Sequence, residues 1–220
     1  MRSRFDEQLT LLNKEMIEMG ALCEEIINTV LKALAEKDEQ LLNRICSLGP
    51  EIDQKERTIE TLCLKLLLQQ QPVATDLRQI SAALKMITDM ERIGDQAEDI
   101  AEMAPFVTNR PRTVDTLLNE MAEASIKMVT ESVDAFVDKN VKLAQKVVTD
   151  DDIVDHYFIQ IKQELIREII ANPKDGECSI DLLMIAKYFE RIGDHATNIA
   201  EWVVFSVTGI HKAGSKRCKL

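Results

Sequence analysis

The sequence predicts an all-α protein made of two tandem antiparallel three-helix bundles related by internal duplication. Apolar residues recur at helical spacing over long stretches, and the 220 residues include only seven Gly and five Pro. The phrase Glu-Arg-Ile-Gly-Asp occurs at 91–95 and again at 190–194, so the copies are 190 − 91 = 99 residues apart. A repeat of this period divides the chain into two similar units.

The first two helices are expected over residues 5–35 and from Asp38 onward. Apolar side chains in the first stretch recur every three or four residues, which is typical of a helix with one buried face. Asp38 is a suitable cap for the second helix, which should end at the QQQP turn near Pro72. Gly49-Pro50 falls inside this second segment, and we expect it to break or kink the helix.

A third helix completes the first unit. Thr75 or Asp76 is expected to cap it, and it should continue to about Met103, just before Pro105. The first bundle is therefore assigned to residues 1–108.

The second half repeats this plan after a linker, NRPRT, around Pro111. Short connections between long helices favour antiparallel neighbours, so this half should form a second bundle over residues 113–209. A turn at NPKDGE precedes its last helix, and the basic tail at 210–220 is expected to be disordered. The expected helices cover about residues 115–138, 143–169 and 179–207.

Composition and charge exclude several classes of protein. The formal net charge of −11 disfavours binding to nucleic acid, and no apolar run approaches the roughly 20 residues that span a bilayer. The N-terminal residues lack the apolar core of a signal peptide, so we expect a cytoplasmic protein. The five cysteines are scattered without a CxxC pair, which indicates reduced thiols, mostly buried as small apolar residues.

Each third helix carries a stripe of acidic side chains at the repeated phrase. At 100° per residue, successive members of the stripe fall within about 80° of one another. Glu98 flanks the first stripe. The members are Glu91, Asp95, Asp99 and Glu102 in the first half, and Glu190, Asp194, Asn198 and Glu201 in the second.

Two interpretations of these stripes are open. Charged runs are usually solvated faces, but like charges one turn apart destabilise a helix by roughly 0.2–0.5 kcal/mol a pair. The same helix angles carry apolar residues one to three turns earlier, which indicates that the stripes are partly enclosed. Partly desolvated carboxylates need counter-cations.

The preceding helix offers acids at the level of each phrase. Antiparallel pairing from the turns places Asp53 near the first phrase, and Asp151 and Asp155 near the second. In the first half, Gly49 occupies the position equivalent to Asp151. Opposed carboxylate pairs form an all-oxygen cage that suits Mg²⁺, Mn²⁺, Ca²⁺, iron or Zn²⁺.

Basic residues and histidines adjoin the acids. Arg92 and Arg191 follow the first acid of each phrase, and either an ion pair with a neighbouring helix or a contact to a partner or phosphate would explain them. His156 and His195 each adjoin a stripe acid and are interpreted as hydrogen-bonded boundary residues, with metal ligation as the alternative.

The segment QPVATDLRQISAALKMITDMERIGDQAEDIAE at 71–102 closely resembles the signature of the PhoU family, and FERIGDHATNIAE at 189–201 resembles its second copy. The resemblance covers nearly the whole chain. It implies a negative regulator of the phosphate-starvation response that links the Pst phosphate ABC transporter to the PhoR sensor kinase. It also implies a homodimer and multinuclear metal sites on the acidic helix faces.

Residue by residue, the resemblance implies metal ligands in both halves. The metal would be iron, zinc, magnesium or manganese. Gly49 suggests that the first site differs from the second in occupancy. The implied ligands are Asp53, Glu91, Asp95 and Asp99 in the first half, and Asp151, Asp155, Glu190, Asp194 and Asn198 in the second.

Two other functions compete with a non-catalytic adaptor. Clustered carboxylates on helices also build metal-dependent enzymes, and vacant acidic faces would leave a purely structural scaffold. The sequence has no P-loop, Gly-rich turn or readable nucleophile arrangement, and neither half has ExxH on its stripe. We therefore predict that the protein is not an enzyme.

Overall fold

The structure, a computed structural model, describes residues 2–36, 38–69, 73–107 and 111–210. Over these ranges the chain forms six α-helices and two short 3₁₀ turns, with no β-strand, which confirms the predicted all-α class. The helices are α1 (Arg2–Glu36), α2 (Glu39–Gln69), α3 (Ala74–Met103), α4 (Arg112–Val137), α5 (Val141–Ala171) and α6 (Gly176–Thr208), and the turns are η1 (Ala104–Phe106) and η2 (Pro173–Asp175).

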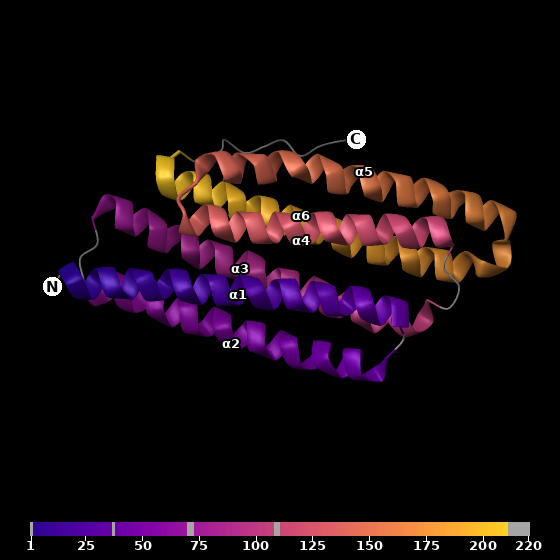
Figure 1. The fold of residues 1–220 in the computed structure, drawn as a ribbon, viewed down its shortest axis with the longest axis horizontal. Coiled ribbons are helices and arrows are strands. Elements are labelled where there is room, and N and C mark those ends of the chain that lie inside the picture. Colours follow the sequence, from indigo (N-terminus) through magenta and orange to yellow (C-terminus); the bar gives the residue numbers. More distant parts are fainter. Residues whose placement is uncertain (1, 37, 70–72, 108–110, 211–220) are drawn as a thin grey trace.

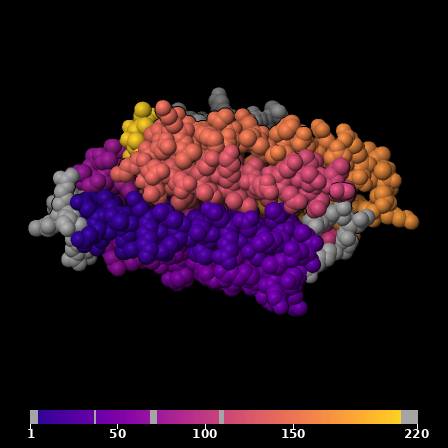
Figure 2. Space-filling model, in the orientation of Figure 1, coloured from indigo at the N-terminus to yellow at the C-terminus, as the bar shows by residue number. Residues whose placement is uncertain are grey.

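The helices form two layers in an elongated body (Figure 1). One layer has the order α2, α3, α6, α5, and α1 and α4 pack over its centre and against each other. The two halves of the chain lie side by side along most of their length, as the purple and orange bands of Figure 2 show. The most extensive contact between them joins α3 to α6.

Helical periodicity accounts for the core. Along α1 the buried side chains recur every three or four residues, so one face of a long helix enters the interior while the other stays polar. The completely buried positions of α1 are Leu12, Met16, Met19, Cys23, Ile26, Ile27 and Val30. Burial raises the pKa of the Cys23 and Cys63 thiols to about 12, so these cysteines behave as apolar core residues.

Equivalent helices of the two halves pack antiparallel. A Cβ added to Gly20 of α1 would lie 3.1 Å from Cγ2 of Val133 in α4, so the backbone there approaches closely. One turn later, the Thr130 hydroxyl donates to Oε1 of Glu24 at 2.8 Å. The halves are therefore related by an approximate two-fold axis.

The α3–α6 contact follows the same antiparallel register. Arg78 near the start of α3 lies against Ser206 near the end of α6, and Asp89 contacts His195. Residues later in α3 therefore contact residues earlier in α6. The two Glu-Arg-Ile-Gly-Asp phrases lie level with each other at the centre of the molecule.

Two local predictions need correction. Of the break or kink expected at Gly49-Pro50, the break is wrong, because helix α2 continues through Pro50. Pro50 and Cys46, one turn earlier, are both exposed, so the carbonyl that loses its backbone donor can face water. The N-cap of α3 is Val73, with no side-chain cap bond, and Asp76 instead lies in the first turn, where a negative charge suits the helix dipole.

The remaining ends are close to expectation. Asn140 caps α5 by accepting from the Leu143 N–H at 3.1 Å, and Gly209 ends α6 in the left-handed region with φ 75°. The predicted QQQP turn and basic tail, and part of the NRPRT linker, lie largely outside the described residues. None of the described helices combines the length and the apolar character needed to cross a membrane.

Candidate acidic site

The glycine of each repeated phrase brings two helices into close contact. A Cβ added to Gly94 would lie 3.1 Å from Cδ1 of Ile52, and one added to Gly193 would lie 3.3 Å from Cγ1 of Val154. These contacts join α2 to α3 and α5 to α6. Because Asp53 follows Ile52, and Asp155 follows Val154, the acid of the preceding helix is level with each phrase, as the turn register predicted.

Five carboxylates of α2 and α3 form the first cluster, which comprises Asp53, Glu56, Glu91, Asp95 and Glu98. Burial raises the pKa of Glu91, and Asp95 raises it further, with Glu56 and Asp53 acting in the same direction. The pKa of Glu98 is raised by burial and then by Asp95 and Asp53. The pKa of Glu56 is also raised, first by burial. Burial and mutual repulsion therefore both disfavour the ionised form of these carboxylates.

Glu98 fills the space left by Gly49. A Cβ at Gly49 would lie only 1.9 Å from Oε1 of Glu98. At the equivalent places in the second half, α5 carries Asp151 and α6 carries Thr197. Each half thus places one acid at this point, from α3 in the first repeat and from α5 in the second. Sequence reasoning placed Glu98 only at the flank of the stripe.

The second cluster lies between α5 and α6 and includes the ammonium group of a lysine side chain. Lys187 donates to Oε2 of Glu190 and lies 5.3 Å from the centroid of the Phe158 ring. The first repeat has Thr88 at the place of Lys187, so only the second cluster has this lysine. Asp151, Asp155 and Asp194 are all partly buried and lie on the same two helices.

Two predicted ligands lie at the seam between the repeats. The amide of Asn198 donates to Oδ1 of Asp89 on α3 at 3.0 Å, and Nδ1 of His195 lies 2.8 Å from the same oxygen. Asp99 occupies the equivalent place in α3 and lies near Arg191 of α6. The pKa of Asp99 is raised, mainly by burial, while the charge of Arg191 acts to lower it. A helix wheel could not show which neighbour these residues face.

The two arginines of the phrases differ in their contacts. Arg92 pairs within its own phrase, with 3.0 Å from Nη1 to Oδ2 of Asp95 and 3.5 Å from Nε to Oε2 of Glu91. The predicted alternative of an ion pair with a neighbouring helix is therefore wrong for Arg92. Arg191 lies over the Tyr188 ring, 5.8 Å from its centroid.

The donor atoms fit a hard cation, although they do not enclose one. The first cluster offers only carboxylate oxygens, the ligands that magnesium, manganese and calcium prefer. Within the described part of the chain, no three Asp, Glu, His or Cys side chains converge on a common point. A bound ion would require rotation of side chains that are partly solvated. The metal sites stay a prediction.

Comparison with known proteins assigns the family. The model of the PhoU domain matches residues 16–104 and 118–203, inside the predicted units 1–108 and 113–209. A Rhizobium meliloti protein described as a phosphate-specific transport system accessory protein PhoU homolog is 31% identical, with 97% of this chain and 91% of the relative aligned. A Clostridium acetobutylicum protein of the same description is 33% identical, with 94% and 96% aligned.

Solved structures agree in fold. The crystal structure of PhoU from Pseudomonas aeruginosa has a TM-score of 0.87 and 32% identity, covering 94% of this chain and all of that one. The phosphate transport system regulatory protein PhoU from Streptococcus pneumoniae has a TM-score of 0.85 and 26% identity, covering 94% and 98%. These are accessory and regulatory proteins, which confirms the prediction that the chain is not an enzyme. The duplicated phrase, the six-helix architecture and these matches show that the chain belongs to the PhoU family.

Proposed function

We propose that the protein is a cytoplasmic accessory protein of phosphate uptake that keeps phosphate-starvation genes repressed while phosphate is plentiful. In this role it docks on the cytoplasmic side of a Pst-type phosphate transporter and passes the transporter's status to a PhoR-type histidine kinase. The support is family membership over nearly the whole chain, because the relatives are named as accessory proteins of phosphate-specific transport.

The regulatory role is tested in cells. Deletion of the gene should leave phosphatase and transporter genes expressed in high phosphate, and a plasmid copy of the full chain should restore repression. A reporter fused to a phosphate-starvation promoter measures both. Normal repression in the deletion strain contradicts the regulatory role.

We further propose that the acidic clusters bind divalent or trivalent metal ions, with iron, zinc, magnesium and manganese as the candidates. One observation carries this proposal. Burial and neighbouring carboxylates raise the pKa of both Glu91 and Glu98, so a cation placed between α2 and α3 would relieve repulsion that Arg92 compensates only in part.

Metal analysis tests this part. Protein purified without chelators should carry metal by mass spectrometry, and the metal-stripped chain should rebind Mn²⁺ or Zn²⁺ in a calorimetric titration. The pair Asp53→Asn and Glu91→Gln should reduce first-repeat binding at least tenfold, and Asp194→Ala should do so in the second repeat. Glu123→Gln is the matched control, because Glu123 is an exposed acid of α4, in the other layer.

The outcomes separate the alternatives. The metal proposal is contradicted if no metal co-purifies or rebinds and Asp194→Ala changes neither the melting temperature nor repression. The protein would then be a structural scaffold whose acidic faces bind no metal. The homodimer expected for the family is tested by light scattering of the full chain, and a monomer at micromolar concentration contradicts it.

A further inference from the structure

The two acidic clusters differ at one pair of neighbouring positions. In the first repeat these positions hold Glu56 of α2 and Thr88 of α3, and in the second repeat they hold Phe158 of α5 and Lys187 of α6. The spacing from α2 to α5 is 158 − 56 = 102 residues, and that from α3 to α6 is 187 − 88 = 99 residues, the spacing of the two phrases. We call Glu56 and Thr88 the first pair, and Phe158 and Lys187 the second pair.

The members of each pair interact across two helices. Burial raises the pKa of Glu56 most, and the hydroxyl of Thr88 acts in the opposite direction through a hydrogen bond. In the second pair, Nζ of Lys187 lies 5.3 Å from the centroid of the Phe158 ring, whose face attracts an ammonium group. The second repeat thus loses one negative charge and gains one positive charge at the same place.

Lys187 also binds an acid of its phrase. The ammonium group donates to Oε2 of Glu190, whose side chain is only 16% exposed. Glu190 is one of the predicted metal ligands. A cation held beside a ligand carboxylate opposes the binding of a second cation, because the two repel each other and share the same oxygen atoms.

The first cluster has a more solvated basic partner. Arg92 pairs with Glu91 and Asp95, so it compensates part of the negative charge there. The side chain of Arg92 is 57% exposed, compared with 38% for Lys187, so water and salt screen its charge more strongly. The first cluster therefore keeps the more negative surroundings.

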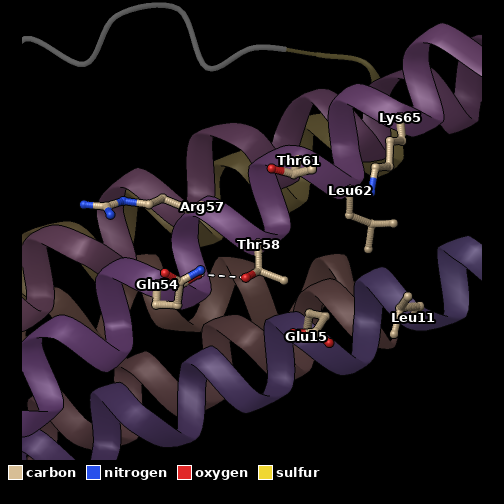
Figure 3. A pocket seen from close by; sticks show the side chains of 8 residues that line it. All are labelled: Leu11, Glu15, Gln54, Arg57, Thr58, Thr61, Leu62 and Lys65. Carbon is tan, nitrogen blue, oxygen red and sulfur yellow. Dashed lines mark hydrogen bonds between the residues drawn. The ribbon is translucent and has the colours of Figure 1, made fainter.

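The lysine that adjoins the first pair in the sequence faces another helix. Lys55 donates to Glu15 at 2.7 Å and to Glu18 at 2.6 Å, and both acids belong to α1. Figure 3 shows Glu15 of α1 and Thr58 of α2 beside a groove of about 330 Å³ between these two helices. The ammonium group of Lys55 is therefore held in the α1–α2 contact and does not take the role of Lys187.

We propose that the two pairs set the metal affinity of their clusters, so that the first repeat binds a divalent cation more tightly than the second. In the second repeat Lys187 serves as a tethered counter-ion, and the Glu190 carboxylate becomes a ligand only when this ammonium group leaves it. The inference rests on the proposed metal binding. It adds which repeat binds first and which residues decide the order.

Binding of Mn²⁺ to the metal-stripped full chain tests the proposal, with free Mn²⁺ measured by electron paramagnetic resonance. Two classes of site should appear, and their affinities should differ by about tenfold or more, because a divalent ion responds strongly to a nearby unit charge. Asp53→Asn with Glu91→Gln should remove the tighter class, and Asp194→Ala should remove the weaker one. These variants assign each class to a repeat.

Exchange of the pairs should then reverse the difference. Phe158→Glu with Lys187→Thr gives the second repeat the side chains of the first pair and should raise its Mn²⁺ affinity at least about tenfold, so that the two classes merge. Glu56→Phe with Thr88→Lys should lower the affinity of the first repeat by a similar factor. Lys187→Thr alone and Thr88→Lys alone should act in the same directions by at least about threefold.

Matched controls make the same change in net charge away from the clusters. Lys127→Glu changes the charge by −2, as the exchange in the second repeat does, and Glu123→Lys changes it by +2, as the exchange in the first repeat does. Both residues are exposed on α4, in the other layer, and each control should change affinity less than twofold. Circular dichroism shows which variants keep their helix content, and the single substitutions decide the outcome for any exchange that does not.

The results separate this inference from the metal proposal beneath it. If the wild-type chain binds no Mn²⁺, the metal proposal and this inference both fail. If it binds Mn²⁺ with equal affinity in the two repeats, or more tightly in the second, the metal proposal stands and this inference is overturned. Smaller shifts than expected in the folded exchange variants, or equal shifts in the controls, also overturn it.

Discussion

The two acidic clusters have the same backbone frame but neutralise their charge differently. Both rest on a phrase glycine that brings two helices together, at Gly94 and at Gly193. The first cluster has Thr88 where the second has Lys187, whose ammonium group binds Glu190. The frame therefore depends on helix packing, whereas the charge balance depends on single side chains that differ between the repeats.

The largest expected effect comes from breaking the shared frame. Gly94→Val should lower the free energy of unfolding by about 2–3 kcal/mol, because the first added carbon already lies 3.1 Å from Ile52 and the core is closely packed. Urea denaturation measures the change. Gly176→Ala is the control, since a Cβ there meets nothing within 4 Å, and it should be neutral or slightly stabilising. An equal loss in both variants would show that close packing is not what Gly94 provides.

The seam between the repeats should give the next largest effect. Asp89→Ala removes the acceptor shared by His195 and Asn198, and should lower the free energy of unfolding by about 1–3 kcal/mol. Thermal unfolding followed by circular dichroism measures it. Asp76→Ala, in the first turn of the same helix, should cost less than about 1 kcal/mol. Equal effects of the two changes would argue against a structural role for this seam contact.

Moving the acid of the first cluster from α3 to α2, as in the second repeat, tests the difference between the two clusters. Gly49→Asp should destabilise the first repeat by about 1 kcal/mol, because the new side chain meets the Glu98 carboxylate. Adding Glu98→Thr recreates the Asp151 and Thr197 arrangement and should recover most of the loss. A double-mutant cycle with urea denaturation measures the coupling. Additive effects would mean that Gly49 and Glu98 do not compensate for each other.

The pH dependence of stability should show the smallest effect. The pKa values of Glu91 and Glu98 are raised in the folded state, so the folded protein binds more protons than the unfolded chain in the window above their ordinary pKa values. Stability should therefore increase as the pH falls from 7 toward 5. Thr88→Lys should flatten this slope and add about 0.5 kcal/mol at pH 7, a magnitude discounted for partial exposure.

The reverse change in the second repeat provides the control for this pH effect. Lys187→Thr removes the lysine bound to Glu190 and should steepen the same slope, and urea denaturation at several pH values follows both variants. A wild-type stability that falls steadily from pH 7 to pH 5 would contradict the raised pKa values of Glu91 and Glu98.

The sequence predicted the repeat, the helices and the level at which Asp53 and Asp155 meet the phrases, because these follow from periodicity and turn position. It could not predict that Asp99 and Asn198 face the other repeat, since α3 and α6 become neighbours only through tertiary packing. The uninterrupted α2 was missed because propensity alone ignores that Pro50 lies on the solvent side. The contact of Glu98 with Gly49 depends on a side-chain rotamer that no sequence pattern specifies.

The antiparallel pairing of equivalent helices also bears on how the chain folds. Within each half, helices that pack together are joined by short connections, so each bundle can collapse from nearby segments with little loop-closure entropy. The α3–α6 and α1–α4 contacts join distant parts of the chain and would form last. A nascent first half would expose the apolar face of α3 until α6 is synthesised, and during that interval a partner half from another chain could dock in its place.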